Sequence, residues 1–262
     1  MIGFIGGGNM AEAMIKGMLR SNLKDIIISE PRHERREYLE YAYHIKTTPN
    51  NSDVIRQCSI VILAVKPQNM DDVTAEISGA VANDTIIVSI AAGVTLSYLT
   101  SRLKTTKIIR VMPNTPALVQ EGMSVLALCE DITDSEMATV RDIFLSFGKV
   151  LVLPEKYLDA VTALSGSGPA FIALFVEAMI DAGVKMGITE EDALKLSRQT
   201  LLGTAKLLET GIPPAKLREM VTSPGGTTAA GLKVFGEKDF YGLIFQVIRA
   251  ATERSKELGR NG

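Results

Sequence analysis

Short apolar runs rich in β-branched residues alternate with longer amphipathic stretches through the first half of the chain. Most segments between the runs are long enough for a helix that crosses over a sheet, and this alternation is typical of parallel strands covered by helices on both faces. The pattern therefore predicts an α/β fold with a doubly wound, mostly parallel sheet. The expected strands are Ile2–Ile5, Ile26–Ser29, Ile60–Ala64, Ile86–Ile90, Ile108–Met112, Ser124–Leu128 and Val150–Leu153.

The pattern changes near Pro154, where the strand signal ends. From Leu158 onward, alanine, leucine and methionine recur at helical spacing, and glycines separate successive helices. We therefore expect two domains, an α/β domain over residues 1–154 and an all-α domain over residues 155–262. A helical domain of this size makes only a modest core, so a second copy is expected to cover its apolar faces. This predicts a homodimer or a higher homo-oligomer; a helical cap folded onto its own α/β domain is the alternative.

Composition and charge narrow the class of protein. The 262 residues are 46% hydrophobic and 22% charged, with a formal net charge of -2, which fits a soluble globular protein without a basic surface for nucleic acid. The longest apolar runs are shorter than the roughly 20 residues of a membrane-spanning helix, and the N-terminus lacks the features of a signal peptide. Cys58 and Cys129 cannot build a disulfide framework. We expect a cytoplasmic protein that binds neither membrane nor nucleic acid.

A glycine loop follows the first expected strand. It consists of Gly6, Gly7, Gly8, Asn9, Met10 and Ala11 and leads into a helix expected over Glu12–Leu19. This is the GxGxxA spacing of dinucleotide-binding loops, in the required place between a strand and a helix. Gly6 allows the tight turn, Gly8 lets the backbone approach a pyrophosphate, and Ala11 allows close packing of helix on strand. The phosphates would lie at the helix N-terminus. We predict a Rossmann-like dinucleotide-binding domain; a glycine-rich turn of a flavodoxin-like fold is the alternative.

The end of the second strand carries conflicting signals about the nucleotide. Glu30 lies where an acid could hold the ribose 2′-hydroxyl of NADH, whereas the nearby Arg32, Arg35 and Arg36 could bind the 2′-phosphate of NADPH. Arginines at a solvated helix start would give the same pattern. We expect NADPH as the cofactor, with NADH as the alternative.

Further strand ends are expected at the same edge of the sheet, where ligands of open α/β sheets bind. Lys66 follows one strand and could contact phosphate or ribose, or could simply be exposed to solvent. Ala92 follows the next strand and should also border the cofactor. Asn114 and Thr115 lie between two prolines and would form either a pocket wall or a structural turn.

The expected pocket contains no evident acid, base or metal site. The chain has two histidines, His33 and His44, and both lie near the second expected helix rather than at the strand ends. No Cys/His cluster is spaced for a metal, and no nucleophile is paired with a base. An iminium substrate suits such a site, because it accepts hydride at carbon and becomes a neutral amine.

Longer motifs extend over nearly the whole chain. They are GFIGGGNM, LAVKP, VSIAAGVT, RVMPNTPALVQEGM, DAVTALSGSGPAF, TLLGTAKLLETG and MVTSPGGTT. In this order they resemble the pyrroline-5-carboxylate reductase family, which catalyses the last step of proline synthesis. The resemblance implies reduction of the cyclic imine 1-pyrroline-5-carboxylate to L-proline by NADPH or NADH.

The resemblance also implies a role for the loop VTSPGGTTAAGL at residues 221–232, which interrupts two expected helices. In the family this loop binds the imine and faces the nicotinamide across a dimer of interlocked helical domains. Backbone N–H groups after Ser223, Gly225 and Gly226 would receive the substrate carboxylate. The hydroxyl of Thr228 would contact the ring nitrogen, mainly to position it. Thr227 is expected in the same substrate loop, and helix capping is the alternative role of both threonines.

Matching to the family extends to the nucleotide. By this matching the cofactor contacts are Gly6, Gly7, Gly8, Asn9, Met10, Asn51, Val65, Lys66 and Ala92. Glu30, Arg32 and Ala64 are expected to contact the cofactor as well, from their places at or just after strand ends. Glu30 departs from the small or polar residue often found there in members that prefer NADPH.

Two other functions fit parts of the sequence. A β-hydroxyacid dehydrogenase of the 6-phosphogluconate type would share the two-part architecture, but such enzymes place a catalytic lysine on the long helix after the Rossmann half, and the equivalent stretch here, SGSGPAFIALFVEAM, contains no lysine. A non-catalytic paralogue that binds a nucleotide and dimerises is the alternative from a different class.

Overall fold

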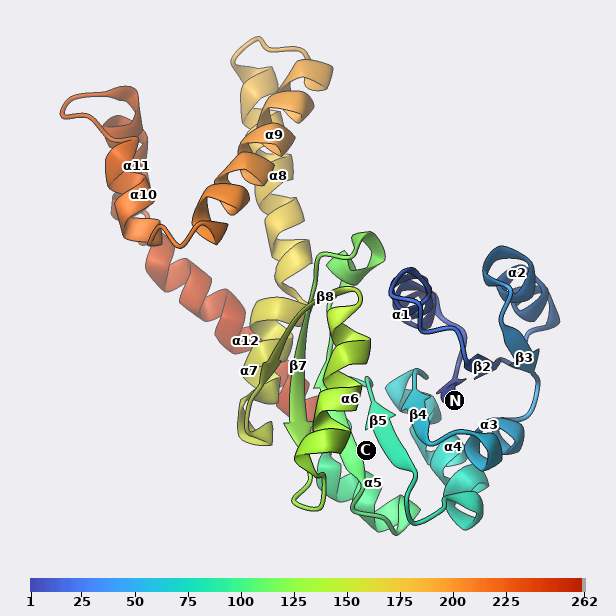
Figure 1. Ribbon diagram of the computed structural model, residues 1–262. Helices are drawn as coiled ribbons and strands as arrows, with labels where there is room; N and C mark the ends of the chain where they lie inside the picture. The colour runs from blue at the N-terminus through green and yellow to red at the C-terminus, as the bar shows by residue number, and fades with distance from the viewer. Residues whose placement is uncertain (261–262) are drawn as a thin grey trace. The chain divides into compact units, whose positions relative to one another are not determined.

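The computed structural model describes residues 1–260, which divide into two compact units (Figure 1). Unit 1 comprises Met1–Ser167 together with the chain from Arg249 onward, and unit 2 comprises Gly168–Ile248. The strands of the described chain all lie in unit 1, and the regular elements of unit 2 are helices. This is the predicted order of an α/β half followed by a helical half.

Unit 1 is built on one eight-stranded sheet. The strands are β1 (Ile2–Ile5), β2 (Ile26–Ser29), β3 (Lys46–Thr48), β4 (Ile60–Leu63), β5 (Ile86–Ser89), β6 (Ile108–Met112), β7 (Gly122–Leu128) and β8 (Gly148–Val152). Their order is β3-β2-β1-β4-β5-β6-β7-β8, and the pairs are parallel except for the antiparallel pair β6 and β7. The predicted mostly parallel sheet is confirmed. The prediction missed β3, a short strand with the polar sequence Lys-Thr-Thr at the sheet edge.

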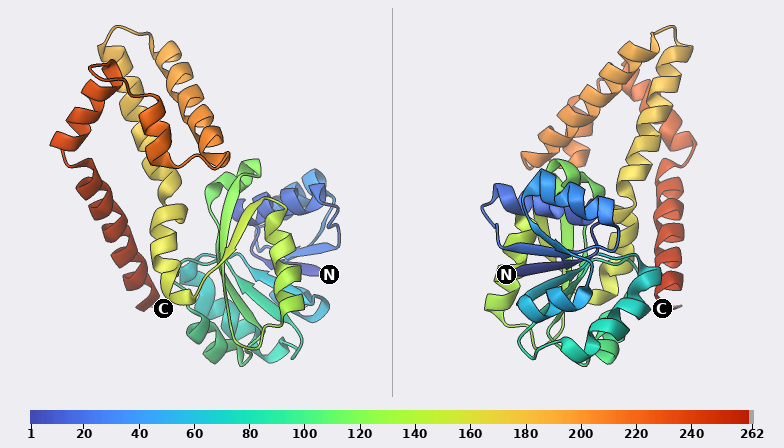
Figure 2. Two further views of the ribbon diagram at one scale, coloured as in Figure 1. Left: turned by 60° about the vertical axis from the view of Figure 1, so that its left-hand side comes forward. Right: turned by 90° about the vertical axis from the view of Figure 1, so that its right-hand side faces the viewer.

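Helices cover both faces of this sheet (Figure 2). They are α1 (Asn9–Arg20), α2 (His33–Tyr43), α3 (Asn51–Gln57), α4 (Met70–Ile77), α5 (Leu96–Leu103), α6 (Asp134–Leu145) and the short α7 (Leu158–Val161). Buried residues of α1, α2 and α6 pack on one face, and those of α3, α4, α5 and α7 pack on the other. Because neighbouring strand residues point to opposite faces, Phe4 belongs to the first core and Ile5 to the second.

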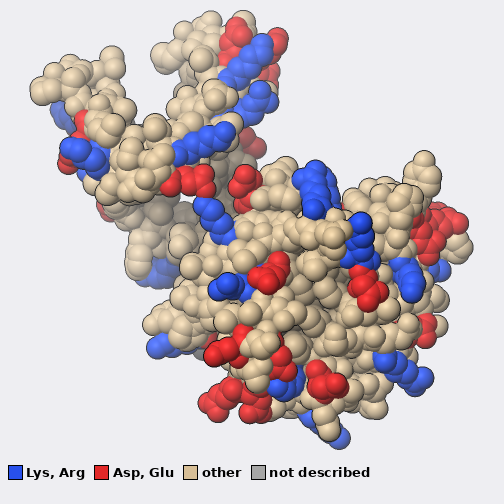
Figure 3. All heavy atoms as spheres, viewed as in Figure 1, with Lys and Arg blue, Asp and Glu red and all other residues tan. Residues whose placement is uncertain are grey.

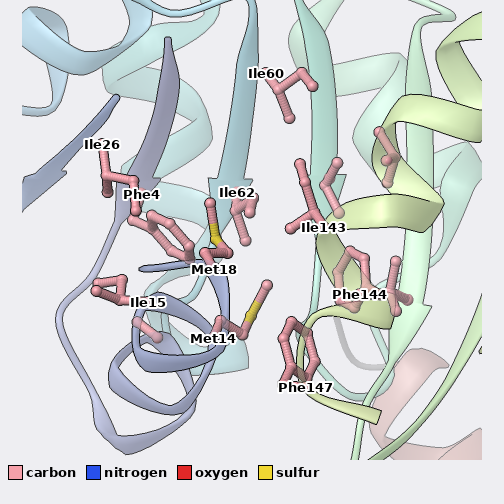
Figure 4. Packing of buried hydrophobic residues seen from close by; sticks show 14 of the residues in the cluster. Phe4, Met14, Ile15, Met18, Ile26, Ile60, Ile62, Ile143, Phe144 and Phe147 are labelled. Atoms are coloured by element: carbon pink, nitrogen blue, oxygen red, sulfur yellow. The ribbon is translucent and has the colours of Figure 1, made fainter. Parts of the chain in front are cut away.

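The first of these two cores fixes the helix that follows the glycine loop. Met14 and Met18 of α1 lie between Phe4 on β1 and Phe147 beyond α6, and all four side chains are fully buried (Figure 4). A Cβ at Gly17 would lie 2.7 Å from Cβ of Phe147, so α1 packs too closely there for a side chain. The N-terminus of α1 is therefore held firmly at the carboxyl end of β1.

Unit 2 contains four complete helices and the start of a fifth. They are α8 (Gly168–Lys185), α9 (Glu190–Glu209), α10 (Pro214–Met220), α11 (Thr227–Glu237) and α12 (Phe240–Arg260), whose last part belongs to unit 1. Neither α8 nor α11 contains a buried residue, and α9 buries only Ala193 and Ser197. Large apolar side chains such as Leu174, Met186 and Val234 are exposed. This unit thus has almost no core of its own within a single chain.

The extent of unit 1 differs from the predicted division at residue 154. Ion pairs and hydrogen bonds tie the following segment to the sheet: Arg110 of β6 donates to Glu155 over 2.9 Å. Leu158 is buried in the second core, and the Ser255 hydroxyl of α12 donates to Asp159 over 2.7 Å. These contacts hold residues 155–167 and the end of α12 with the α/β unit. Where the two functional domains divide stays a prediction.

Candidate active site

The glycine loop turns sharply between β1 and α1. Gly6 has a φ of +100°, and a Cβ there would lie 2.7 Å from the carbonyl oxygen of Ala64, so this position requires glycine. Gly8 caps α1, which begins at Asn9 rather than at the expected Glu12. Nothing lies within 4 Å of a Cβ built on Gly8. The first turn of α1, with its unpaired backbone N–H groups, is therefore open to an anionic group.

Two adjoining hollows lie along the carboxyl ends of the strands. One, of about 500 Å³, is lined by Gly6, Gly7, Gly8, Ser29, Glu30, Arg32, Asn51, Ala64, Val65 and Lys66, among others. The second, of about 530 Å³, is lined by residues that include Asn9, Met10, Ile90, Met112, Asn114 and Gly166. It shares Gly8, Arg32, Ala64, Val65 and Lys66 with the first. The structure thus brings together every predicted cofactor residue except Ala92. Ala92 lines a separate small depression beside Gly93 and Leu258.

Glu30 is the buried acid of the first hollow, only 4% exposed. Its carboxylate accepts hydrogen bonds from the Gly7 N–H over 3.0 Å, from the Arg32 N–H over 3.1 Å and from Arg32 Nε over 2.7 Å. Burial alone would raise the pKa of Glu30, but the hydrogen bonds from Arg32 and Gly7 outweigh it and hold the pKa below its usual value. Glu30 is therefore an anion at neutral pH.

The other two arginines of this segment are bound to the backbone. Arg35 donates to the Gly7 carbonyl oxygen over 2.7 Å and forms an ion pair with Glu12 of α1. Arg36 donates to the carbonyl oxygen of Glu30 over 2.7 Å. The bond by which Arg35 braces the glycine loop was not predictable, because nothing in the spacing relates residues 7 and 35.

Two segments that are far apart in the sequence form one wall of the second hollow. Asn114, after β6, accepts a hydrogen bond from the Met123 N–H over 2.8 Å and donates to Ser165 over 3.2 Å. Ser165 lies in a π-helical turn, Thr162–Gly166, and a Cβ at Gly166 would come 2.5 Å from the end of Met112. Asn114 therefore serves both of its predicted roles, as structural turn and as pocket wall. The π-helical turn was missed; such turns are frequent at functional sites.

In unit 2, the loop Ser223–Gly226 joins α10 to α11. Gly225 has a φ of +70°, and the Gly226 N–H donates to the Ser223 carbonyl oxygen over 3.0 Å. Gly226 is the N-cap of α11, so Thr227 and Thr228 are already helical and neither side chain caps the helix. Within residues 1–260 no hydrogen bond of the Thr228 hydroxyl is found, and this side chain is half-buried. Its hydroxyl is free for another partner.

Cys58 and the two histidines do not line either hollow. Burial raises the pKa of the Cys58 thiol to about 11, so it is protonated at neutral pH. His33 is exposed beside Glu37, and His44 ends α2. Over residues 1–260 no group of three or more His, Cys, Asp or Glu side chains is arranged to hold a metal ion.

Comparisons with known proteins agree along the whole chain. Residues 155–258 match the family model described as pyrroline-5-carboxylate reductase dimerisation, and residues 1–93 match that of NADP oxidoreductase, coenzyme F420-dependent. A pyrroline-5-carboxylate reductase of Synechocystis is 42% identical, with 99% of this chain and 98% of that protein covered. One of Methanosarcina acetivorans is 39% identical, with 99% and 98% covered.

Solved structures give the same answer. A pyrroline-5-carboxylate reductase from Coxiella burnetii has a TM-score of 0.93 at 33% identity, with 98% of this chain and 97% of that chain covered. The pyrroline carboxylate reductase of Plasmodium falciparum, solved with NADP bound, has a TM-score of 0.86 at 31% identity, with 98% and 97% covered. With relatives this similar over its full length, the chain belongs to the pyrroline-5-carboxylate reductase family.

Proposed function

We infer that this protein reduces 1-pyrroline-5-carboxylate to L-proline with NADPH, the last step of proline biosynthesis. The observation that carries the inference is the 42% identity to a pyrroline-5-carboxylate reductase over 99% of the chain. The site agrees with it, because an imine reduction needs hydride and a positioned substrate but no strong acid or base. The same similarity disfavours both a β-hydroxyacid dehydrogenase and a paralogue that has lost its activity.

We propose that the nucleotide binds in the two hollows of unit 1. Gly6 allows the turn, Gly8 leaves room for a pyrophosphate beside the N-terminus of α1, and Lys66 is an exposed cation at the same rim. The bound nucleotide supplies the hydride at its nicotinamide ring. We propose that Gly6, Gly7, Gly8, Asn9 and Met10 hold the phosphates, and that Asn51, Ala64, Val65 and Lys66 line the rest of the site. Ala92, which lies in a separate depression, is proposed as a more distant contact.

The substrate is proposed to bind at the loop before α11. The backbone N–H groups of Ser223 and Gly225 and the one after Gly226 would hold its carboxylate at a helix start, where the helix dipole favours an anion. The Gly226 N–H bonds within the loop and Pro224 has no N–H, so these two residues would shape the loop instead. Thr227 would line the same loop. Thr228 would place its hydroxyl on the ring nitrogen and thereby fix the imine carbon for hydride transfer.

The protein is further proposed to act as a homodimer, with a higher oligomer as the alternative. The match of residues 155–258 to a dimerisation family supports a dimer, and so do the exposed apolar side chains of α8 and α11. The segment Glu155–Lys185 is long and apolar enough to cross a membrane by length and composition alone. A helix that pairs with a second copy has the same apolar character, so we assign this segment to the dimer interface and the protein to the cytoplasm.

A direct assay of nucleotide oxidation distinguishes the possible functions. Purified protein is mixed with 1-pyrroline-5-carboxylate and either NADPH or NADH, and oxidation of the nucleotide is followed by its absorbance. The expected result is turnover that depends on the imine, with none when a β-hydroxy acid and the oxidised nucleotide are supplied instead. Nucleotide binding without turnover would support the non-catalytic paralogue and overturn the reductase.

A further inference from the structure

Glu30 and Arg32 form an ion pair at the rim of the nucleotide hollow. Arg32 donates through Nε to one carboxylate oxygen over 2.7 Å and through Nη2 to the other over 3.2 Å. The carboxylate is 5% exposed, whereas the Arg32 side chain is 66% exposed. Glu30 is thus fixed in the wall of the hollow, and the guanidinium of Arg32 covers it from the solvent side.

The two charges have opposite preferences for the nucleotide. An acid at the end of the second strand accepts hydrogen bonds from a ribose 2′-hydroxyl, and it repels a 2′-phosphate at the same position. A guanidinium binds a 2′-phosphate through charge-assisted hydrogen bonds. In the free protein each of these groups satisfies the other.

Arg32 is the arginine of this segment that is able to change partners. Arg35 and Arg36 are held by backbone carbonyl oxygens, of Gly7 and Glu30 respectively. Arg32 is held by a side chain alone, and its mostly exposed stem leaves room for rotation. If its guanidinium leaves, Glu30 keeps the hydrogen bonds from the N–H groups of Gly7 and Arg32 and stays in place.

We propose that Glu30 and Arg32 form an exchangeable ion pair that sets the preference between NADPH and NADH. This inference rests on the proposed use of a nicotinamide nucleotide. When NADPH binds, Arg32 turns from Glu30 to the 2′-phosphate. Because the ion pair with Glu30 is then lost, part of the binding free energy from the new contact is offset. For NADH, Arg32 stays on Glu30, and the carboxylate accepts the 2′-hydroxyl. The site therefore admits both nucleotides, and Glu30 limits its selectivity for NADPH.

A purely structural role for Glu30 makes a different prediction. The Gly7 N–H bond to Glu30 braces the glycine loop, which holds either nucleotide. If bracing were all that Glu30 does, its loss would weaken both nucleotides equally. Glu30→Gln separates the roles, because the glutamine oxygen still accepts the Gly7 hydrogen bond while the negative charge is removed.

The test measures dissociation constants of NADP⁺ and NAD⁺ by isothermal titration calorimetry, without any turnover. Glu30→Gln is expected to tighten NADP⁺ and weaken NAD⁺, each about fivefold, so that their ratio moves by more than tenfold. Arg32→Ala is expected to weaken NADP⁺ by at least about tenfold and to leave NAD⁺ within about twofold. Glu136→Gln is the matched control. It also neutralises an acid in an ion pair, but this acid pairs with Lys107 at the start of α6 and lines neither hollow. Glutamine at this position preserves the helix cap.

The outcomes are distinct. An unchanged ratio of the two constants in Glu30→Gln, or equal weakening of both nucleotides, would overturn the exchangeable pair. If Glu30→Gln fails to fold, Arg32→Ala decides alone, since an unchanged NADP⁺ constant would overturn the proposal. Wild-type protein that binds neither nucleotide would instead contradict the proposed function.

Discussion

Replacing Thr228 by valine tests the role proposed for its hydroxyl. The side chain stands at the second position of α11, where Gly226 is the N-cap, and no hydrogen bond of its hydroxyl is found within residues 1–260. Valine has nearly the same shape and a similar helix propensity. The free energy of unfolding should therefore change by less than about 0.5 kcal/mol, and the melting temperature by about 2 °C or less.

The effect on catalysis should be much larger. A hydrogen bond to a charged group contributes about 1.5–3 kcal/mol, and each 1.36 kcal/mol of lost transition-state stabilisation is about tenfold in rate. Thr228→Val should therefore lower kcat/KM for the imine by about 10- to 150-fold. Thr228→Ser, which keeps the hydroxyl, should retain most of the activity.

The assay is steady-state reduction of 1-pyrroline-5-carboxylate, with nucleotide affinity and thermal unfolding measured on the same preparations. The affinity for NADP⁺ should be unchanged in both variants. Equal kcat/KM values for the valine and serine variants would refute the role of the hydroxyl. A large fall in melting temperature for valine alone would show that the hydroxyl has a structural partner.

Three further predictions concern stability and assembly. In urea unfolding, Gly148→Ala should destabilise the protein by more than about 2 kcal/mol. The reason is that Gly148 has a φ of +156° and that a Cβ there would lie 1.9 Å from the Gly122 carbonyl oxygen. Gly79→Ala is the neutral control, because nothing lies within 4 Å of a Cβ at Gly79. Hydrogen bonds from Lys107 lower the pKa of Glu136 to about 2, so this acid stabilises the fold above its unfolded pKa of about 4.5 and the contribution is lost as pH falls towards 2. Unfolding curves between pH 6 and pH 3 should thus depend less on pH in Glu136→Gln. Light scattering should give twice the chain mass, and a monomer at micromolar concentration would contradict the dimer.

The central strands of the sheet were predictable because they are buried on both faces. Runs such as Ile60–Leu63 have no polar residue, and such continuous apolar segments are typical of central parallel strands. The edge strand Lys46–Thr48 lies outside this rule, because only one of its residues, Thr48, is buried. The glycine loop was predictable for a different reason, since only glycine allows the backbone at position 6.

The site was predictable only as far as strand ends and motifs reach. They bring Lys66 and Asn51 to the hollow, but they carry no information about which side chains pair there. The sequence showed Glu30 and Arg32 as conflicting signals about the nucleotide. The structure shows that the two side chains bind each other, a contact that depends on rotamers rather than on spacing.

The reductase activity is tested most directly by following the hydride from nucleotide to product. The protein is incubated with 1-pyrroline-5-carboxylate and NADPH carrying two deuterium atoms at C4 of the nicotinamide, and the product is analysed by mass spectrometry and NMR. We expect L-proline with one deuterium on the ring carbon that was double-bonded to nitrogen. Proline without deuterium, or nucleotide that is not consumed, would contradict the reductase activity.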